Sequence, residues 1–492
     1  MKKIIFSLLP VLLVACNEAA QTPASSSDSG AVGGGGGIYK LEAGYVAKPD
    51  VQKLYDELDY QRGVQAYIWG VPLVNAVAMG KALTDAGVSE SEPSLLVFNK
   101  QLTPKQVIMT ANSEVIYAFS IVDLSKTGPL VIESPGGILG GVIDLWQRAV
   151  KDIGIGESAH GGKILLLPPD YKGKIPSGYI IAKSGTKRNI IFGRGIVLPG
   201  QDTGPFVKLA SSIKLYPLTE KDNPRPTKII LNDGKPFNSD WPKDIRYFGY
   251  LSEGLKDAVI EPQDKLMYAM MQPLGIFPGK TFNPDERIKN ILARSAQTGS
   301  DMMINMAFDN RLKDTKPLWK DRMWENIAFT TTPVSENDTI VELDQRTQWY
   351  QLVCNAAYGY GAKLVPGTGT WYASTFRDNA GTHLQGSNMY KLVLTTAPPA
   401  KQFWSVTVYD NRTRSMIDTD QQKAGLSSLG DLKKNADGSI ELYFGPEAPQ
   451  GMESNWIKTI PEQGWFVMFR LYAPLEPLFD GSWKLPDLET MK

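Results

Sequence analysis

The spacing of apolar residues divides the chain into four stretches in which helical and strand patterns alternate. Residues 41–100 and 240–330 carry apolar side chains at close to the helical period of about 3.6 residues. Residues 107–216 and 345–490 instead show short apolar runs separated by Gly, Pro, Asn and Asp, the pattern of strands joined by turns. The order helix, strand, helix, strand predicts two β regions, each preceded by helices.

The helical stretches predict individual helices. One helix is expected over 51–70 and a second over 73–86, because Trp69-Gly70-Val71-Pro72 places a proline inside the apolar pattern. Asn283-Pro284 is typical of a helix start, with Asn as the cap and Pro as the first helical residue. The third stretch predicts helices over residues 247–255, 266–271 and 285–308.

The strand stretches predict β-sandwich modules. With 46 Gly, 33 Pro, 20 Tyr and 11 Trp spread along the chain, the composition suits turns between aromatic-rich strands better than a helical bundle. We therefore predict an α+β fold, mainly β with helical segments, in which two β-sandwich modules are linked and flanked by helices. The clearest strands are predicted at residues 115–122, 130–133, 140–145, 163–167, 179–182, 189–192, 391–395, 403–409, 439–444 and 465–471.

The N-terminus has the pattern of an export signal for a bacterial lipoprotein. Lys2 and Lys3 precede an apolar run over residues 4–14 that is too short to span a bilayer. Leu13-Val14-Ala15-Cys16 resembles a lipobox, in which cleavage after Ala15 leaves the Cys16 thiol to accept diacylglycerol. The alternative is an ordinary signal peptide with a cysteine at this place by chance.

The residues that follow suit a tether between a lipid anchor and a folded body. Residues 16–40 are rich in Ser and Gly and contain too little apolar surface to fold. No later run is expected to form a membrane helix, so the predicted membrane contact is the lipid on Cys16 alone. Asn17 follows this cysteine, and by resemblance to enterobacterial sorting signals it favours the outer membrane, with the protein facing the periplasm.

Composition narrows the candidate chemistry. The 52 basic and 52 acidic residues balance, which gives no basic field for nucleic acid. Cys16 and Cys354 are the only cysteines, so lipidation of the first excludes a disulfide. His160 and His383 are the only histidines and lie in Gly-rich segments. We expect no metal and no cofactor, because metal-ligand spacing, a phosphate loop and a Gly-x-Ser-x-Gly motif are all missing from the sequence.

Acid, arginine and aromatic residues at a strand end are the remaining candidates for chemistry. Asp144 ends a predicted strand, and Trp146 and Arg148 follow at even spacing. In extended conformation all three would share one face, where an aromatic plane and a guanidinium suit a sugar. In a helix, Asp144 and Arg148 would simply pair with each other. A structural ion pair with Trp146 in the core is therefore the competing interpretation.

Similar residues occur beside two other strands. Asp410 and Arg412 follow a strand of the second β region, and Asn112 and Glu114 precede a strand that contains Tyr117. Two carboxylates on either side of a sugar would suit glycosidic or glycosylamine cleavage, with one acid protonated and the other ionised.

Longer motifs resemble a known tandem family. Residues 110–117, 122–131 and 165–173 resemble the DUF1254 family, in motifs such as Leu165-Leu166-Leu167-Pro168-Pro169-Asp170-Tyr171. Residues 371–373, 386–390, 403–410, 435–439, 455–456 and 480–484 resemble its usual partner, the DUF1214 family. The resemblance implies jelly-roll-like β-sandwich domains with some likeness to bacterial peptide N-glycosidases. It implies no assigned activity, and Ala111-Asn112-Ser113-Glu114 stands where many members have Asn-Asn-Asp-Thr.

These patterns divide the chain into five predicted parts. Residues 1–15 form the signal, 16–40 the tether, 41–236 a helical lead-in with the DUF1254-like sandwich, 237–340 a helical connector and 341–492 the DUF1214-like sandwich.

Two functional hypotheses follow from the candidate residues. The first hypothesis is a hydrolase of glycans or glycoconjugates, and the second is a non-catalytic envelope protein that binds a carbohydrate, another small molecule or a partner. Under the first, the catalytic candidates are Asp144, Arg148 and Glu114, and the binding candidates are Asn112, Tyr117, Trp146, Asp410 and Arg412.

Overall fold

The computed structural model describes residues 41–198, 200–311, 317–326, 341–353 and 364–491. The predicted signal and tether, with Cys16, and also Cys354 lie outside the described residues. The chain divides into two compact units, residues 1–55 and residues 56–492. In the first unit, β1 (Leu41–Glu42) pairs with β2 (Tyr45–Val46). The second unit contains both β modules and the helices beside them, including residues 56–85 of the long first helix.

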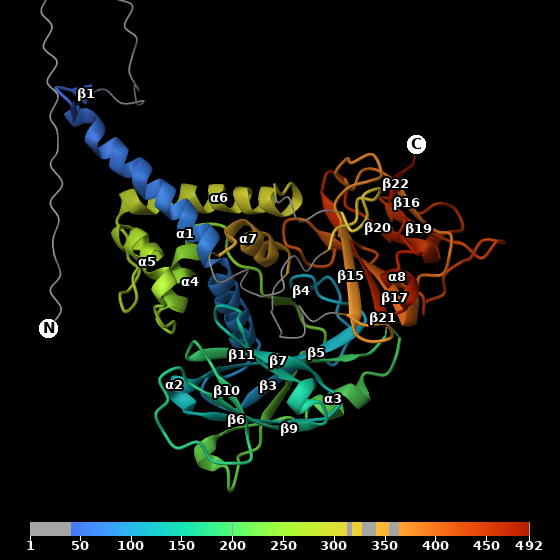
Figure 1. Ribbon diagram of the computed structural model, residues 1–492, viewed down its shortest axis with the longest axis horizontal. Coiled ribbons are helices and arrows are strands. Elements are labelled where there is room, and N and C mark those ends of the chain that lie inside the picture. Colours follow the sequence, from blue (N-terminus) through green and yellow to red (C-terminus); the bar gives the residue numbers. More distant parts are fainter. Residues whose placement is uncertain (1–40, 199, 312–316, 327–340, 354–363, 492) are drawn as a thin grey trace, which may run out of the picture. The chain divides into compact units, whose positions relative to one another are not determined.

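The first β module contains a six-stranded and a four-stranded sheet (Figure 1). The strand orders are β13-β3-β5-β11-β7-β8 and β10-β9-β6-β12. Along β6, Leu130 and Ile132 join the main core, whereas Val131 packs on the opposite face of its sheet. The strands are β3 (Ser94–Val97), β5 (Val115–Asp123), β6 (Leu130–Pro135), β7 (Leu139–Asp144), β8 (Ala149–Ile153), β9 (Gly161–Leu167), β10 (Ile180–Lys183), β11 (Arg188–Ile196), β12 (Lys214–Pro217) and β13 (Lys228–Leu231).

The second β module has two four-stranded sheets, β15-β21-β17-β18 and β20-β19-β16-β22. The predicted α+β class with two sandwich modules is confirmed, although the pairs β10–β9, β13–β3 and β19–β20 are parallel, unlike a purely antiparallel jelly roll. The strands are β15 (Thr370–Thr375), β16 (Tyr390–Leu394), β17 (Ala400–Asp410), β18 (Gly425–Ser427), β19 (Ile440–Gly445), β20 (Trp456–Lys458), β21 (Trp465–Pro474) and β22 (Glu489–Thr490).

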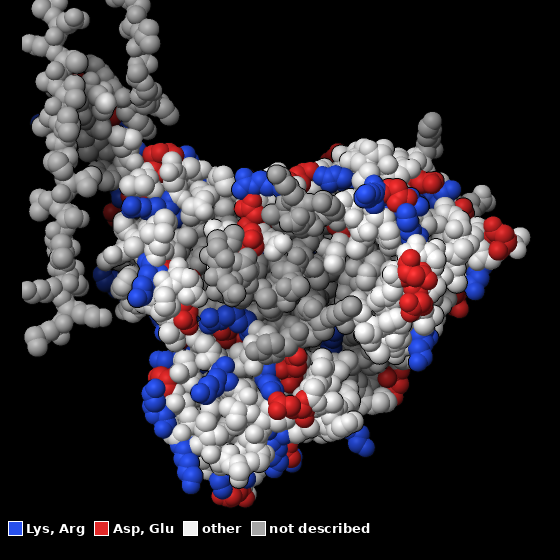
Figure 2. Space-filling model, in the orientation of Figure 1, with Lys and Arg blue, Asp and Glu red and all other residues white. Residues whose placement is uncertain are grey.

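Helices α4 to α7 gather around α1 beside the β modules (Figure 1). The prediction of a cap at Asn283 is wrong by two residues, because Asp285 is the residue whose side chain accepts from the Ile288 amide, at 2.8 Å. On the face shown in Figure 2, basic and acidic side chains are interspersed. The helices are α1 (Lys48–Asp85), α4 (Arg246–Leu255), α5 (Lys265–Met271), α6 (Glu286–Phe308) and α7 (Leu343–Leu352).

Helix α1 corrects the prediction of two helices, because it continues through Pro72 without a break. Proline removes one backbone donor and weakens the helical bonds of the preceding turn. Side chains from other elements supply donors there: Arg346 Nη1 to the Trp69 carbonyl at 3.0 Å and the Tyr247 hydroxyl to the Tyr67 carbonyl at 2.5 Å. Gln147 Nε2 donates to the Pro72 carbonyl at 2.9 Å. Tertiary contacts therefore override the local break signal.

The middle of α1 packs against its neighbours at glycine positions. A Cβ atom on Gly63 would lie 2.4 Å from Ser295 Oγ of α6, and one on Gly70 would lie 2.8 Å from Leu251 Cδ1 of α4. By length and composition α1 is also the one described helix that is long and apolar enough to cross a membrane, contrary to the sequence expectation. However, 89% of that apolar window is buried within the protein, as in the core helix of a globular domain.

Candidate functional site

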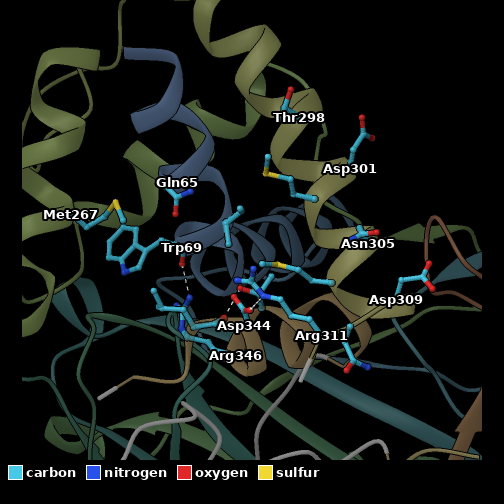
Figure 3. Close-up of a pocket in the computed structure, with 16 residues that line it drawn as sticks. Gln65, Trp69, Met267, Thr298, Asp301, Asn305, Asp309, Arg311, Asp344 and Arg346 are labelled. Carbon is cyan, nitrogen blue, oxygen red and sulfur yellow. Dashed lines mark hydrogen bonds and ion pairs between the residues drawn. The ribbon is translucent and has the colours of Figure 1, made fainter. Parts of the chain in front are cut away.

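Two adjoining cavities, of about 650 and about 500 Å³, lie among α1, α5, α6 and α7. Because the two cavities share several lining residues, we treat them as one groove and call them the first and second cavity. Figure 3 shows how the side chains around the first cavity converge from separate helices. The shared residues are Gln65, Trp69, Met267, Leu343 and Arg346.

The hairpin between β7 and β8 brings two of the predicted residues to the second cavity. Asp144 ends β7, and Gln147 in the following turn has a left-handed φ of 57°. The amide of Asp144 donates to the Arg148 carbonyl at 3.1 Å, which closes the turn. The segment is thus neither the extended strand nor the helix considered from sequence. Trp146 and Arg148 line the second cavity, whereas Asp144 does not.

Asp144 is 1% exposed and is held by Arg148. Arg148 donates to this carboxylate from its backbone amide at 2.9 Å and from Nε at 2.7 Å. Burial raises the pKa of the Asp144 carboxyl, against the opposing charge of Arg148. The ion pair predicted by the structural interpretation is therefore present, and it orients Arg148 at the edge of the cavity.

We expect Asp144→Asn and Arg148→Gln each to lower stability, because each leaves the other group of this pair without its charged partner. Removing the buried carboxylate should cost about 1–3 kcal/mol. In Arg148→Gln, the lost attraction between the two charges should contribute little to the loss of stability, because the Arg148 side chain is 31% exposed. The larger effect is that the buried Asp144 carboxylate then has no cation to compensate its charge. Urea denaturation of both variants and the double variant measures the coupling, and purely additive losses would contradict a pair.

Aromatic side chains form one wall of the second cavity. The ring of Trp69 lies 4.7 Å from that of Trp146 at an interplanar angle of 60°, and 5.9 Å from that of Tyr268. Trp146 is 8% exposed, so half-buried Trp69 presents more of its ring to the cavity. Tyr350 of α7 also lines this wall.

The charged groups of the second cavity are two guanidinium groups and one carboxylate among the described residues that line it. Arg346 of α7 is buried, and its guanidinium carbon lies 5.5 Å from the Tyr350 ring. Burial lowers the pKa of Arg346. Burial raises the pKa of Asp264, although Arg346, a hydrogen bond from Trp69 and the charge of Arg148 oppose the shift.

The first cavity carries more acidic groups. Asp344 pairs with Arg311 Nε at 2.7 Å, and Asp309 pairs with Arg377. His383 Nε2 lies 3.4 Å from the Asp309 carboxylate. Figure 3 shows Asp301, Asp309 and Asp344 around this cavity, together with methionine side chains. Among the residues that the structure describes, no cluster of His, Cys, Asp and Glu is arranged to hold a metal ion.

Glu114 and Asn112 lie instead in a packed junction between the two β modules. Glu114 is 1% exposed, and its carboxylate accepts from Ser405 Oγ at 3.1 Å and from Ser113 Oγ at 2.7 Å. Asn112 Nδ2 donates to the Tyr472 hydroxyl at 2.5 Å. Burial raises the pKa of the Glu114 carboxyl. Because these side chains line neither cavity, their contacts join the modules rather than form part of the groove.

Tyr117 belongs to the same junction, which also contains a buried arginine. The Tyr117 hydroxyl accepts from the Asn112 amide at 3.2 Å. Arg470 is 1% exposed and donates to Thr407 Oγ1 at 2.8 Å and to the Tyr409 hydroxyl at 2.6 Å. These polar residues form what we call the junction cluster: Asn112, Ser113, Glu114, Tyr117, Ser405, Thr407, Tyr409, Arg470 and Tyr472.

Asp410 and Arg412 occupy a third place, the turn after β17. Asp410 Oδ1 accepts from the amides of Arg412 at 2.6 Å and Thr413 at 3.1 Å, so this carboxylate caps the turn. The side chain of Arg412 is 67% exposed. Arg414, which is completely buried, donates instead to Asp240 at 3.3 Å. Neither Asp410 nor Arg412 lines the groove.

Several groove residues were missed by sequence reasoning. Trp69 was assigned to a helix break, and Arg346 and Asp264 carried no motif. Met302 and Met306 also carried no motif, and both line the first cavity, whereas Met303 between them is 1% exposed. Helical spacing was the available signal, because it places residues 302 and 306 on one face and 303 on another.

Comparisons with known proteins identify the two β modules. Residues 94–217 match the family described as "Protein of unknown function (DUF1254)", and residues 369–476 match "Protein of unknown function (DUF1214)". Among solved structures, the chain is similar to the VPA0106 protein from Vibrio parahaemolyticus, with 18% identity and a TM-score of 0.51 over 88% of this chain and 100% of that one. An uncharacterized protein from Burkholderia cenocepacia shows 11% identity and a TM-score of 0.39 over 90% and 97%. No curated protein matches the chain.

Proposed function

The chain belongs to the tandem DUF1254–DUF1214 family, and from this premise we propose that it is a non-catalytic binding protein of the bacterial cell envelope that holds a glycoconjugate in the groove. The observation that carries the proposal is the second cavity, which is lined by both aromatic rings and guanidinium groups. An aromatic ring packs against the C–H face of a sugar, and guanidinium groups donate to its oxygens or to a carboxylate.

The choice of binding over hydrolysis follows from the carboxylates. Hydrolysis of a glycosidic bond by the usual mechanisms needs two carboxyl groups about 5–10 Å apart across the bond. Asp264 is the single carboxylate among the described residues that line the second cavity, and Asp144 is tied to Arg148 behind it. The raised pKa of Asp264 would suit a general acid, but the opposing base is missing from this lining.

The binding test uses the full chain on a glycan array, followed by calorimetry with each glycan that binds. We expect Trp69→Ala to weaken binding at least tenfold, because it removes the half-buried ring that lines both cavities. Trp319→Ala is the matched control, since Trp319 is half-buried, lines neither cavity and packs beside Trp371 of the second β module. Release of a free sugar from a bound glycan would support the hydrolase instead, and failure to bind any glycan would contradict the proposal.

We further propose that Cys16 carries the lipid that anchors this protein in the outer membrane, facing the periplasm. The support is the sequence pattern of residues 1–16 and the Ser- and Gly-rich residues after it. Cys16→Ala should move the protein from the membrane fraction to the soluble fraction. Retention in the membrane after a high-salt wash would rule out the lipid anchor.

A further inference from the structure

Arg346, at the junction of the two cavities, differs from Arg188 and Arg414, two other buried arginines. Arg188 forms ion pairs with Asp257 and Glu253, and Arg414 pairs with Asp240. For Arg346, no carboxylate among the described residues lies within ion-pair distance. The Asp264 charge acts on Arg346 only from farther away, and Arg346 donates a hydrogen bond to the Trp69 carbonyl.

A buried guanidinium without a counter-ion is costly, because burial removes the water that stabilises its charge. Arg346 is only 9% exposed, and its side chain reaches both cavities. The guanidinium presents several donors in a fixed planar fork that matches a carboxylate or a phosphate. An anionic group of a ligand would therefore supply the missing charge.

The rest of the groove is unusually apolar for exposed surface. Leu266 is 68% exposed, Leu343 is 56% exposed and Met302 is 45% exposed. Methionine side chains are flexible and adapt to apolar partners of varied shape, which suits a chain better than a rigid ring. The apolar residues that line the groove include Leu266, Met267, Met270, Met302, Met306 and Leu343.

We propose that the ligand is an anionic amphiphile, and this proposal rests on the proposed binding function. The carboxylate or phosphate of the ligand pairs with Arg346, and its unbranched apolar chain lies along the methionines. One carboxylate of the first cavity favours this direction. Asp309 and Asp344 are paired with Arg377 and Arg311, but Asp301 forms no ion pair among the described residues and repels an anion from its part of that cavity. A sugar attached near the anionic group would then meet Trp69 in the second cavity.

The test measures binding of three ligands with the same chain: decanoate, decyl phosphate and decyl glucoside, each below its micelle concentration. The protein is the full chain with Cys16→Ala, in detergent-free buffer. We expect at least one of the two anions to bind tenfold or more tightly than the neutral glucoside. The two anions separate a carboxylate ligand from a phosphate ligand. Equal affinity for all three would overturn the role of Arg346 and leave the glycoconjugate function standing.

A different result would support the anionic site and contradict the glycoconjugate function. If decanoate or decyl phosphate binds while no glycan does on the array, the anionic site holds and the glycoconjugate function fails. Arg346→Met should abolish the preference for anions, and Arg346→Lys should retain part of it. Arg246→Gln, at a 72% exposed arginine outside the groove, should bind like the parent.

A second variant guards against loss of folding, because Arg346 also donates to α1. Leu343→Glu adds a negative charge beside Arg346 at an exposed position, so it should weaken binding of the anion at least tenfold without lowering the melting temperature. Leu429→Glu is its matched control, since Leu429 is 53% exposed and lines neither cavity. Unchanged anion binding by folded Leu343→Glu would overturn the proposal.

Discussion

Replacing Arg470 by methionine is expected to lower the free energy of unfolding by about 3–5 kcal/mol, the usual result of removing one partner from a buried charged network. Arg470 lies in the junction cluster, where it donates to Thr407 and Tyr409 and its charge lowers the pKa of Glu114. Without Arg470, Glu114 remains 1% exposed and loses the cation whose charge opposes the effect of burial. Urea denaturation at neutral pH measures the loss.

The loss of stability in Arg470→Met should depend on pH, and the carboxyl group of Glu114 determines the direction of this dependence. In the variant, the pKa of Glu114 in the folded state lies further above its unfolded value than in the parent, because burial then acts unopposed by Arg470. A raised acid pKa means that stability falls as pH rises from the unfolded pKa to the folded pKa. Arg470→Met should therefore be less damaging near pH 4 than near pH 7.

The matched control is the double variant Glu114→Gln with Arg470→Met. A neutral amide at residue 114 removes the uncompensated charge, so the double variant should be more stable at neutral pH than Arg470→Met alone. A double variant that is less stable by the sum of both single losses would show that Glu114 and Arg470 act independently.

Trp324→Ala is expected to have a loss of similar size, about 3–5 kcal/mol, because it empties a fully buried site for a large aromatic side chain. Trp324 is 0% exposed, its ring lies 6.3 Å from that of Phe469, and its Nε1 donates to the Pro486 carbonyl at 2.7 Å. The next residue, Glu325, pairs with Ser374 at the end of β15. The tryptophan thus fixes residues 317–326 on the second β module.

Thermal denaturation of Trp324→Ala, beside Trp319→Ala, checks this expectation. Trp319 is half-buried, and its ring lies 6.1 Å from that of Trp371, so its loss should cost clearly less. Equal melting temperatures for Trp324→Ala and the parent would show that the segment contributes little to the folded state.

Local patterns in the sequence predicted most of the elements. The strand predicted at 115–122 is β5 (Val115–Asp123), and the helix predicted at 285–308 is α6 (Glu286–Phe308). Such elements have apolar residues at the period of a strand or a helix, which depends only on near neighbours. Pro72 is the exception, because donors from distant residues keep α1 continuous through it.

The groove could not be predicted in the same way, because its residues come from four helices, a hairpin and the segments next to these helices, which meet only in the folded chain. Sequence reasoning identified Trp146 and Arg148 from their chemistry beside a strand. It grouped them with Glu114 and Asp410, which occur in similar local patterns but lie in other places. Whether a strand end faces a cavity, a junction or solvent depends on contacts between modules, and local spacing carries no information on them.

The side-chain donors around Pro72 have a consequence for how the protein folds. The donors to the carbonyls of residues 67, 69 and 72 come from α4, α7 and the β7–β8 hairpin, far apart along the chain. The central turns of α1 are therefore completed only when all three elements have docked. We expect residues 56–492 to melt in one cooperative transition, with amide protons near residue 72 exchanging only by global unfolding. We also expect slow folding, because these contacts join residues far apart in the sequence.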